Sequence, residues 1–221
     1  MGVNNQRRLV ASCLSLLVAL LVACSRGGEQ KSVDFDGDAD GATNANVRKN
    51  VKPEADAQVA VIETDYGRIV LELYPNLAPQ MVARFKQLAS TGFYNGTTFH
   101  RIDPDLGIIQ GGDPRSKDDD PDNDGTGSSP EPNLPAEFTD IPYERGTVGA
   151  ARATDINSAN CQFFITLKRQ PAFDQHYTVF GKVIEGLNNA DIISHAPVRE
   201  GTEHPADQVT IKSITLEARP R

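Results

Sequence analysis

Alternating apolar residues mark the start of the folded part of this 221-residue chain. The alternating positions are Val59, Val61, Ile69, Leu71 and Leu73. Residues two apart share one face of a strand, and Asp65-Tyr66-Gly67 lies between the two apolar runs as a turn. The pattern therefore predicts a β-hairpin over residues 58–74.

Apolar residues at spacings of three and four predict two helices. The first carries Met81, Val82, Phe85 and Leu88. Pro79 suits its first turn, Asn76 is a candidate cap, and Gly92 lies shortly past its end. The second helix is predicted over residues 187–195.

Short segments with turn residues between them predict the remaining strands. They cover residues 97–102, 108–110, 147–150, 162–166, 178–183 and 209–216. Many short strands with two helices favour a mainly β fold, built as a closed antiparallel β-barrel. Periodicity and composition alone leave a β-sandwich open.

The first 23 residues have the features of a signal peptide. Arg7 and Arg8 precede an apolar run over residues 9–23, which is shorter than the roughly 20 apolar residues that a membrane-spanning helix needs. The run ends in Leu21-Val22-Ala23-Cys24, which resembles a bacterial lipobox. Cleavage before Cys24 and lipidation of its thiol would anchor the protein to a membrane. The alternative is an ordinary secretory peptide that is cut near Ala23.

The expected domains are a lipoprotein signal peptide (1–23), a lipidated Cys24 with a flexible acidic tether (24–56), and one folded domain (57–221). The tether is polar and poor in large apolar residues, so it cannot bury enough surface to fold. We expect the protein to be lipid-anchored in the bacterial cell envelope. By resemblance to lipoprotein sorting rules, Ser25 favours the periplasmic face of the outer membrane.

Charge and cysteine content exclude some functions. The formal net charge is −8, and it becomes −10 when Arg7 and Arg8 leave with the signal peptide. An acidic protein of this kind is a poor nucleic-acid binder. With Cys13 removed and Cys24 lipidated, Cys161 is left without a disulfide partner, and we expect it to fill a tight core position; a reactive thiol is the alternative.

Three separated motifs suggest a site. They are Phe99-His100-Arg101-Ile102, Gln110-Gly111-Gly112-Asp113 and Gln162-Phe163-Phe164-Ile165. In this order they resemble the cyclophilin family of peptidyl-prolyl isomerases, over residues 59–216. The resemblance implies an eight-stranded barrel with a helix capping each end, and isomerase activity without a cofactor.

Prolyl isomerisation breaks amide resonance, with a barrier of about 18–20 kcal/mol. A donor aimed at the prolyl nitrogen favours the twisted state, in which that nitrogen regains a lone pair. Arg101 is the candidate donor, since guanidinium keeps its charge and has several N–H groups in a fixed fork. By resemblance, Gln110 contacts the substrate backbone and braces Arg101, and Gln162 is a second amide for the backbone.

The resemblance also implies a proline pocket. Phe164 matches its floor and Phe173 its wall, and Ala151 and Arg152 match the segment that binds the substrate backbone in an extended form. Tyr177 occupies a position that is His in many members; its hydroxyl can still donate a hydrogen bond.

The chain departs from the family pattern in three places. The interval from Arg101 to Gln110 is one residue longer than in eukaryotic members, and its usual Phe is missing, so Leu106 and Ile108 are expected to line the pocket. Ala172 stands where drug-sensitive members carry Trp, which argues against tight cyclosporin binding. His100 is expected to be structural.

An acidic stretch suggests a second site. Asp120, Asp122, Asp124 and Glu131 have the spacing of a calcium-binding loop, with Gly125 at the turn position. Pro121 and the absence of flanking helical patterns favour a solvated loop instead, so we assign no firm metal site.

The leading hypothesis is an envelope peptidyl-prolyl isomerase acting on proline-containing exported polypeptides. The alternative is a proline-peptide-binding chaperone module with little turnover, and a calcium-linked surface scaffold is a third, weaker hypothesis. We expect a monomer, with the lipid on Cys24 as its contact with the membrane.

Overall fold

The computed structural model describes residues 47–219; residues 1–46 and 220–221 lie outside the description. Within that range the chain forms eight strands and two α-helices. The strands are β1 (Gln58–Thr64), β2 (Gly67–Leu73), β3 (Arg101–Asp103), β4 (Ile108–Gly111), β5 (Thr147–Ala150), β6 (Phe163–Thr166), β7 (Val179–Glu185) and β8 (Ile211–Ala218). The α-helices are α1 (Pro79–Ser90) and α2 (Leu187–Ser194), and short 3-10 turns include η2 (Pro114–Lys117), η3 (Pro121–Asn123) and η4 (Pro171–Phe173).

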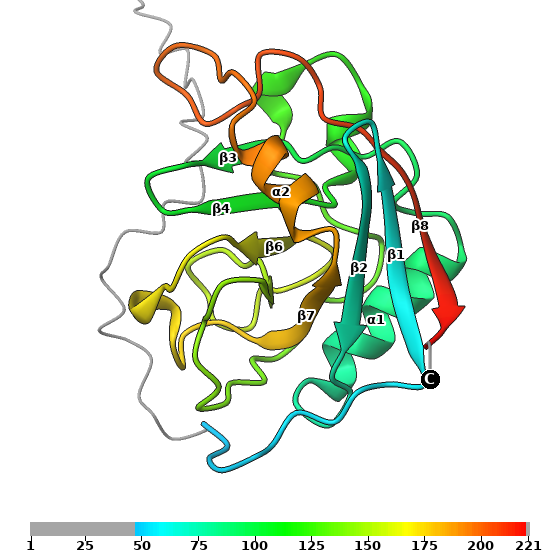
Figure 1. The fold of residues 1–221 in the computed structure, drawn as a ribbon, viewed down its shortest axis with the longest axis vertical. Coiled ribbons are helices and arrows are strands. Elements are labelled where there is room, and N and C mark those ends of the chain that lie inside the picture. The colour runs from blue at the N-terminus through cyan, green and yellow to red at the C-terminus, as the bar shows by residue number, and fades with distance from the viewer. Residues whose placement is uncertain (1–46, 220–221) are drawn as a thin grey trace, which may run out of the picture. The chain divides into compact units, whose positions relative to one another are not determined.

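All eight strands belong to one antiparallel sheet, in the order β3-β4-β6-β5-β7-β2-β1-β8. The sheet curls, so its strands change direction along it. In Figure 1, β1, β2 and β8 stand upright, while β3, β4 and β6 run roughly horizontally. The predicted hairpin forms β1 and β2, and both predicted helices are present. The prediction of a mainly β, cyclophilin-like fold is confirmed.

The prediction of a closed barrel is wrong, because β3 and β8 are the edges of an open sheet. The expected strand over residues 97–102 is reduced to the three residues of β3. In the segments just before β3 and β8, an isolated bridge pairs Thr98 with Thr210. Beyond that bridge the loop after α2 intervenes. The Ile102 N–H donates to the carbonyl of Glu203 in this loop, at 2.7 Å, so the loop occupies the place beside β3 that closure would require.

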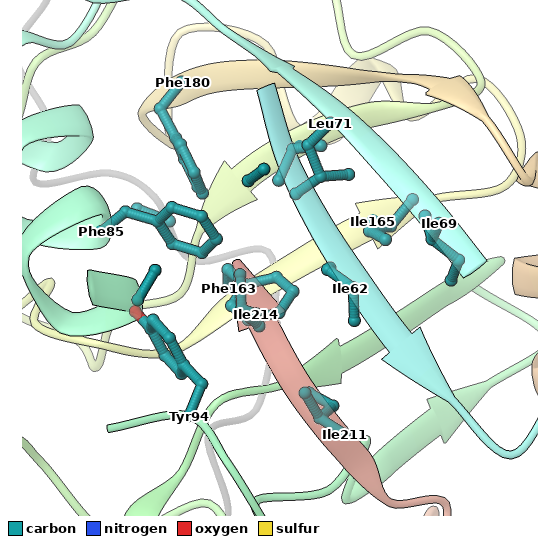
Figure 2. Close-up of a cluster of buried hydrophobic side chains, with 14 of the residues drawn as sticks. Ile62, Ile69, Leu71, Phe85, Tyr94, Phe163, Ile165, Phe180, Ile211 and Ile214 are labelled. Carbon is teal, nitrogen blue, oxygen red and sulfur yellow. The ribbon is translucent and has the colours of Figure 1, made fainter. Parts of the chain in front are cut away.

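Aromatic side chains fill the space between α1 and the curled sheet (Figure 2). Phe85 of α1 is fully buried, and its ring centroid lies 5.2 Å from that of Tyr94, 5.5 Å from Phe163 and 5.3 Å from Phe180. Aromatic pairs at such distances gain from edge-to-face contacts in addition to burial. This cluster therefore fixes α1 against β6 and β7.

The start of α1 is held by a residue that the pattern did not indicate. Its N-cap is Ala78, which has no side chain to accept a hydrogen bond, and the predicted cap Asn76 does not serve there. The Glu137 carboxylate accepts from the backbone N–H groups of Gln80 and Met81, both at 3.0 Å. A carboxylate at this end satisfies otherwise unpaired donors and complements the helix dipole.

Residues 47–56 pack on the domain, although the sequence predicted that the tether continues to residue 56. The Arg48 N–H donates to Phe138 O at 3.0 Å, and the Asp56 N–H donates to Leu73 O at 2.9 Å. Lys86 of α1 forms an ion pair with Asp56 at 2.8 Å. These contacts hold Arg48 and Asp56 on the folded domain.

The predicted signal peptide, Cys24 and the first part of the tether lie outside the described residues. Among residues 47–219, none of the helices has the length and apolar character needed to cross a bilayer.

We predict that Phe85→Ala lowers the free energy of unfolding by about 3–5 kcal/mol, because it leaves a cavity among the rings that α1 contacts. Urea denaturation measures the change. Ile192→Ala on α2 is the control: Ile192 is 53% exposed, so its truncation should cost no more than about 0.5 kcal/mol. Equal losses in the two variants would contradict this account of the core.

Candidate active site

A second apolar cluster lies apart from the α1 core. Its buried members are Tyr74, Leu77, Ile108, Tyr143, Ala151, Phe164, Phe173 and Val179, and Leu106 and Tyr177 pack against it half-buried. The structure thus brings together six residues that the sequence assigned to substrate binding. The assigned six are Leu106, Ile108, Ala151, Phe164, Phe173 and Tyr177.

Three aromatic rings form the centre of this second cluster. Phe164 of β6 meets Phe173 of η4 at 5.5 Å between ring centroids, with the planes at 77°. The Tyr177 ring lies 5.6 Å from Phe164 and 5.0 Å from Phe173. The three rings form a rigid apolar cluster, in which Phe164 and Phe173 are buried.

Tyr143 completes the cluster and was missed by the sequence analysis. Its ring stacks on Phe164 at 5.6 Å and 23°, and it lies edge-on to Phe173. The sequence around Tyr143 carries no motif, so only the fold reveals this contact.

A cleft of about 240 Å³ adjoins the aromatic cluster. Its lining comes from β4, from the end of β5 and from the loop before Ser129; the residues are Gln110, Gly125, Thr126, Gly127, Ser128, Ala151, Arg152, Ala153, Ser158, Asn160 and Gln162. Two of the predicted amides, Gln110 and Gln162, therefore face the same space.

The two amides form a chain of hydrogen bonds that ends on the loop. Gln110 Nε2 donates to Gln162 Oε1 at 3.0 Å, and Gln162 Nε2 donates to the carbonyls of Gly125 at 3.0 Å and Gly127 at 2.9 Å. Within residues 47–219, the buried Gln110 Oε1 has no hydrogen-bond partner. An unpaired buried acceptor on a cleft is suited to receive an N–H from a ligand.

Arg101 begins β3 and lies opposite Gln110 in the β3–β4 ladder. Its Nε forms an ion pair with Glu203, and its Nη2 lies 3.6 Å from Asp103 Oδ2. Its side chain is 13% exposed. Gln110, which was expected to brace this arginine, donates to Gln162. Glu203 was not foreseen because it is 102 positions away in the chain.

The electrostatics of Tyr177 link Arg101 to the aromatic cluster. Burial raises the pKa of Tyr177, and the positive charges of Arg152 and Arg101 act in the opposite direction. The Arg152 guanidinium carbon lies 4.6 Å from the Tyr177 ring centroid. Two positively charged side chains thus act on Tyr177 at the edge of the aromatic cluster. Their charge favours a lone pair or developing negative charge at this edge.

Arg152 also offers its backbone to the cleft. In the described part of the chain, its N–H and its carbonyl make no backbone hydrogen bond, whereas the preceding Ala151 N–H donates to Gln162 O at 3.0 Å. Its guanidinium is fixed by Nε donating to His176 O at 3.1 Å. The unpaired backbone after β5 resembles the edge that an extended peptide can join as an added strand.

Comparison with known proteins agrees with this geometry. Residues 59–216 match the family model described as cyclophilin type peptidyl-prolyl cis-trans isomerase/CLD. The chain is 41% identical over 162 residues to a Brucella suis protein named "Probable peptidyl-prolyl cis-trans isomerase", covering 72% of this chain and 82% of that one. It is 36% identical over 165 residues to human "Peptidyl-prolyl cis-trans isomerase-like 3", covering 72% and 96% of the two chains. A solved cyclophilin type peptidyl-prolyl cis-trans isomerase from Cryptosporidium parvum gives a TM-score of 0.66 at 30% identity, over 74% of this chain and 99% of that one.

This chain belongs to the cyclophilin-type peptidyl-prolyl cis-trans isomerase family. The predicted family is thereby confirmed, and the protein is an isomerase. Leu106 and Ile108, which were expected in place of the usual Phe of the family, both belong to the aromatic cluster. Gly107, at φ +65°, makes the turn that brings these two residues to the cluster.

The carboxylates of the acidic loop, whose spacing suggested a calcium site, make hydrogen bonds within this cyclophilin. Among residues 47–219 there is no group of three or more His, Cys, Asp or Glu side chains placed to hold a metal ion. Asp120 instead caps η3 by accepting from the Asp122 N–H at 3.1 Å, and Glu131 accepts from Gln87 at 3.2 Å. Burial and the nearby Asp113, Asp118 and Asp120 raise the pKa of Asp124 to about 7.

The two remaining candidates for reactive groups are interior residues. His100 is 2% exposed, and burial lowers its pKa to about 4, so the ring is neutral at physiological pH. Cys161 is fully buried, and burial raises its pKa to about 12, which leaves the thiol protonated. A protonated, inaccessible thiol is unreactive, as expected for a residue that fills the core.

We predict that Gly149→Ala impairs this isomerase at its apolar surface. A Cβ at Gly149 would lie 2.4 Å from Phe164 Cζ and 2.6 Å from the Tyr143 hydroxyl, so the Phe164 ring must move. We expect kcat/KM for a proline tetrapeptide to fall by about tenfold, since small displacements of positioning groups are costly.

Gly96→Ala is the matched control for this prediction. A Cβ at Gly96 meets no atom within 4 Å, and its φ of +81° affects stability rather than the cleft. The control should keep wild-type kcat/KM. Unchanged activity in Gly149→Ala would show that Phe164 is not part of the substrate surface.

Proposed function

We propose that this cyclophilin catalyses rotation of X-Pro bonds by directing the Arg101 guanidinium at the prolyl nitrogen of a peptide held over Phe164, Phe173 and Tyr177. The observation that supports it is the position of Arg101, which lies across a ladder from the cleft amide Gln110 and acts electrostatically on Tyr177.

The chemistry requires no proton transfer. When the bond twists, the imide nitrogen loses conjugation and becomes a better hydrogen-bond acceptor, while the planar ground state offers it little. A fixed cation near that nitrogen therefore stabilises the transition state more than the bound substrate. Guanidinium is suited to this role because it stays charged at every physiological pH.

Backbone contacts would hold the peptide in register. The unpaired Gln110 Oε1 can accept an N–H, and the Arg152 backbone can pair with an extended segment. The Cryptosporidium parvum relative has also been solved in the presence of the dipeptide Ala-Pro, at 29% identity and a TM-score of 0.66. That ligand supports a proline-containing peptide as the substrate of the present cleft.

We predict that Arg101→Ala lowers kcat/KM by about a hundredfold, the usual cost of losing one preorganised transition-state donor. Arg101→Lys should recover little, since an ammonium on a flexible stem lacks the planar fork. A tetrapeptide exchange assay by NMR, with the full chain, measures both.

Arg199→Ala, which removes an exposed arginine, controls for charge. Wild-type turnover in Arg101→Ala would exclude the mechanism. Saturable peptide binding without acceleration in the unaltered protein would instead favour the alternative of a peptide-binding chaperone module.

For location, we propose that the isomerase is anchored by lipid on Cys24 in the bacterial cell envelope, on the periplasmic face of the outer membrane, and acts on exported polypeptides. The support is the sequence Leu21-Val22-Ala23-Cys24 behind an apolar run, followed by Ser25. Dual or triple acylation of one residue gives a stable attachment.

We predict that Cys24→Ser abolishes incorporation of labelled palmitate and moves the protein from the membrane to the soluble fraction. Metabolic labelling and fractionation of cells expressing the full chain test this. Cys13→Ser is the control, because Cys13 lies within the expected signal peptide and should not affect labelling. Equal labelling of the wild type and Cys24→Ser would contradict the anchor.

A further inference from the structure

A loop from the far end of the chain contacts the strand that carries Arg101. It comprises residues 195–210, between α2 and β8, and is seen in orange at the top of Figure 1, beside β3. Three consecutive residues of that strand region meet it. His100 O is paired with His204 Nδ1 at 3.0 Å, Arg101 Nε with the Glu203 carboxylate, and the Ile102 N–H with Glu203 O at 2.7 Å.

The loop that carries Glu203 is closed by hydrogen bonds between its own residues. The Arg199 N–H donates to His204 O at 2.9 Å, and Ala206 N–H donates to Pro197 O at 2.7 Å. Val198 and Pro205 form an isolated antiparallel bridge. Because the loop forms hydrogen bonds within itself and with Ile102, the backbone at Glu203 is fixed, and the position of the Glu203 side chain is restricted.

The contact constrains the guanidinium strongly. Glu203 engages Nε and Asp103 lies 3.6 Å from Nη2, so two carboxylates act on one planar group. Charge-assisted bonds of this kind are stronger and more directional than neutral ones. The arginine side chain is 13% exposed and that of Glu203 is 45% exposed, so the ion pair is partly shielded from solvent.

We propose that Glu203 is a positioning residue of this isomerase, which orients the Arg101 guanidinium toward the prolyl nitrogen. This inference rests on the proposed function, in which Arg101 is the donor. A long side chain at the start of a three-residue edge strand has several accessible rotamers. A catalytic group must be held within about 0.5 Å of its productive position, and the Glu203 carboxylate supplies that restraint.

The opposite effect of the same ion pair would be inhibition. A carboxylate that competed with the substrate for Arg101 would lower activity, and its removal would raise turnover. If Glu203 positions Arg101, its substitution lowers turnover. If Glu203 competes with the substrate for Arg101, the same substitution raises turnover.

The test is Glu203→Gln, which keeps the shape and one acceptor oxygen and removes the charge. The Glu203 carbonyl bond to Ile102 is unaffected, so the loop stays docked. In the full chain, we expect kcat for a proline tetrapeptide to fall by about tenfold while KM changes by less than about twofold, since orientation rather than binding is lost.

Glu200→Gln is the matched control, because Glu200 is an exposed acid of the same loop and its change alters net charge equally. It should retain wild-type kcat and KM. The double variant Arg101→Ala with Glu203→Gln should be no slower than Arg101→Ala alone, because a positioning residue has nothing to position once Arg101 is gone. A purely structural role would instead give additive losses.

The outcomes separate this inference from the proposed function. A severe loss in Arg101→Ala with wild-type or higher kcat in Glu203→Gln overturns the role of Glu203 and leaves Arg101 as donor. Additive losses in the double variant overturn it too. Wild-type activity in Arg101→Ala would show that Arg101 is not the donor, and it would exclude the positioning role of Glu203 as well.

Discussion

Strand β6 is the element on which both the core and the cleft depend. Its alternation sends Phe163 and Ile165 into the cluster beneath α1, and Phe164 into the aromatic cluster of the cleft. A shift of one residue would exchange the two sets, because side-chain direction in a strand has a period of two. The ladders to β4 and β5 on either side fix this register. The free energy of core packing therefore also holds Phe164 in place in the aromatic cluster.

The electrostatics of the cleft follow a consistent pattern. Arg101 and Arg152 supply guanidinium charges, and the amides Gln110 and Gln162 supply hydrogen bonds without protons to exchange. His100, which follows Phe99 in the first motif, is buried and its pKa is low, so it does not act as an acid or base at neutral pH. These groups suit a reaction that turns a bond without making or breaking one.

The sequence predicted the elements whose patterns are local. The hairpin and the two helices follow from spacing, and the structure reproduces them. The features that the sequence did not predict depend on contacts between residues that are distant in the chain. Glu137 at the start of α1, Tyr143 beneath Phe164 and Glu203 on Arg101 each act on residues that no periodicity connects to them. The spacing of the acidic loop likewise gave no sign of the hydrogen bonds that Asp120 and Glu131 make.

The carbonyl of Glu203 has a further effect on an exposed sheet edge. A short outer strand with unpaired N–H groups is a template on which a foreign chain can add itself, and such additions lead to aggregation. The Ile102 N–H on β3 is already bonded to Glu203 O. This bond therefore leaves one N–H fewer at the β3 edge for main-chain pairing with a foreign chain.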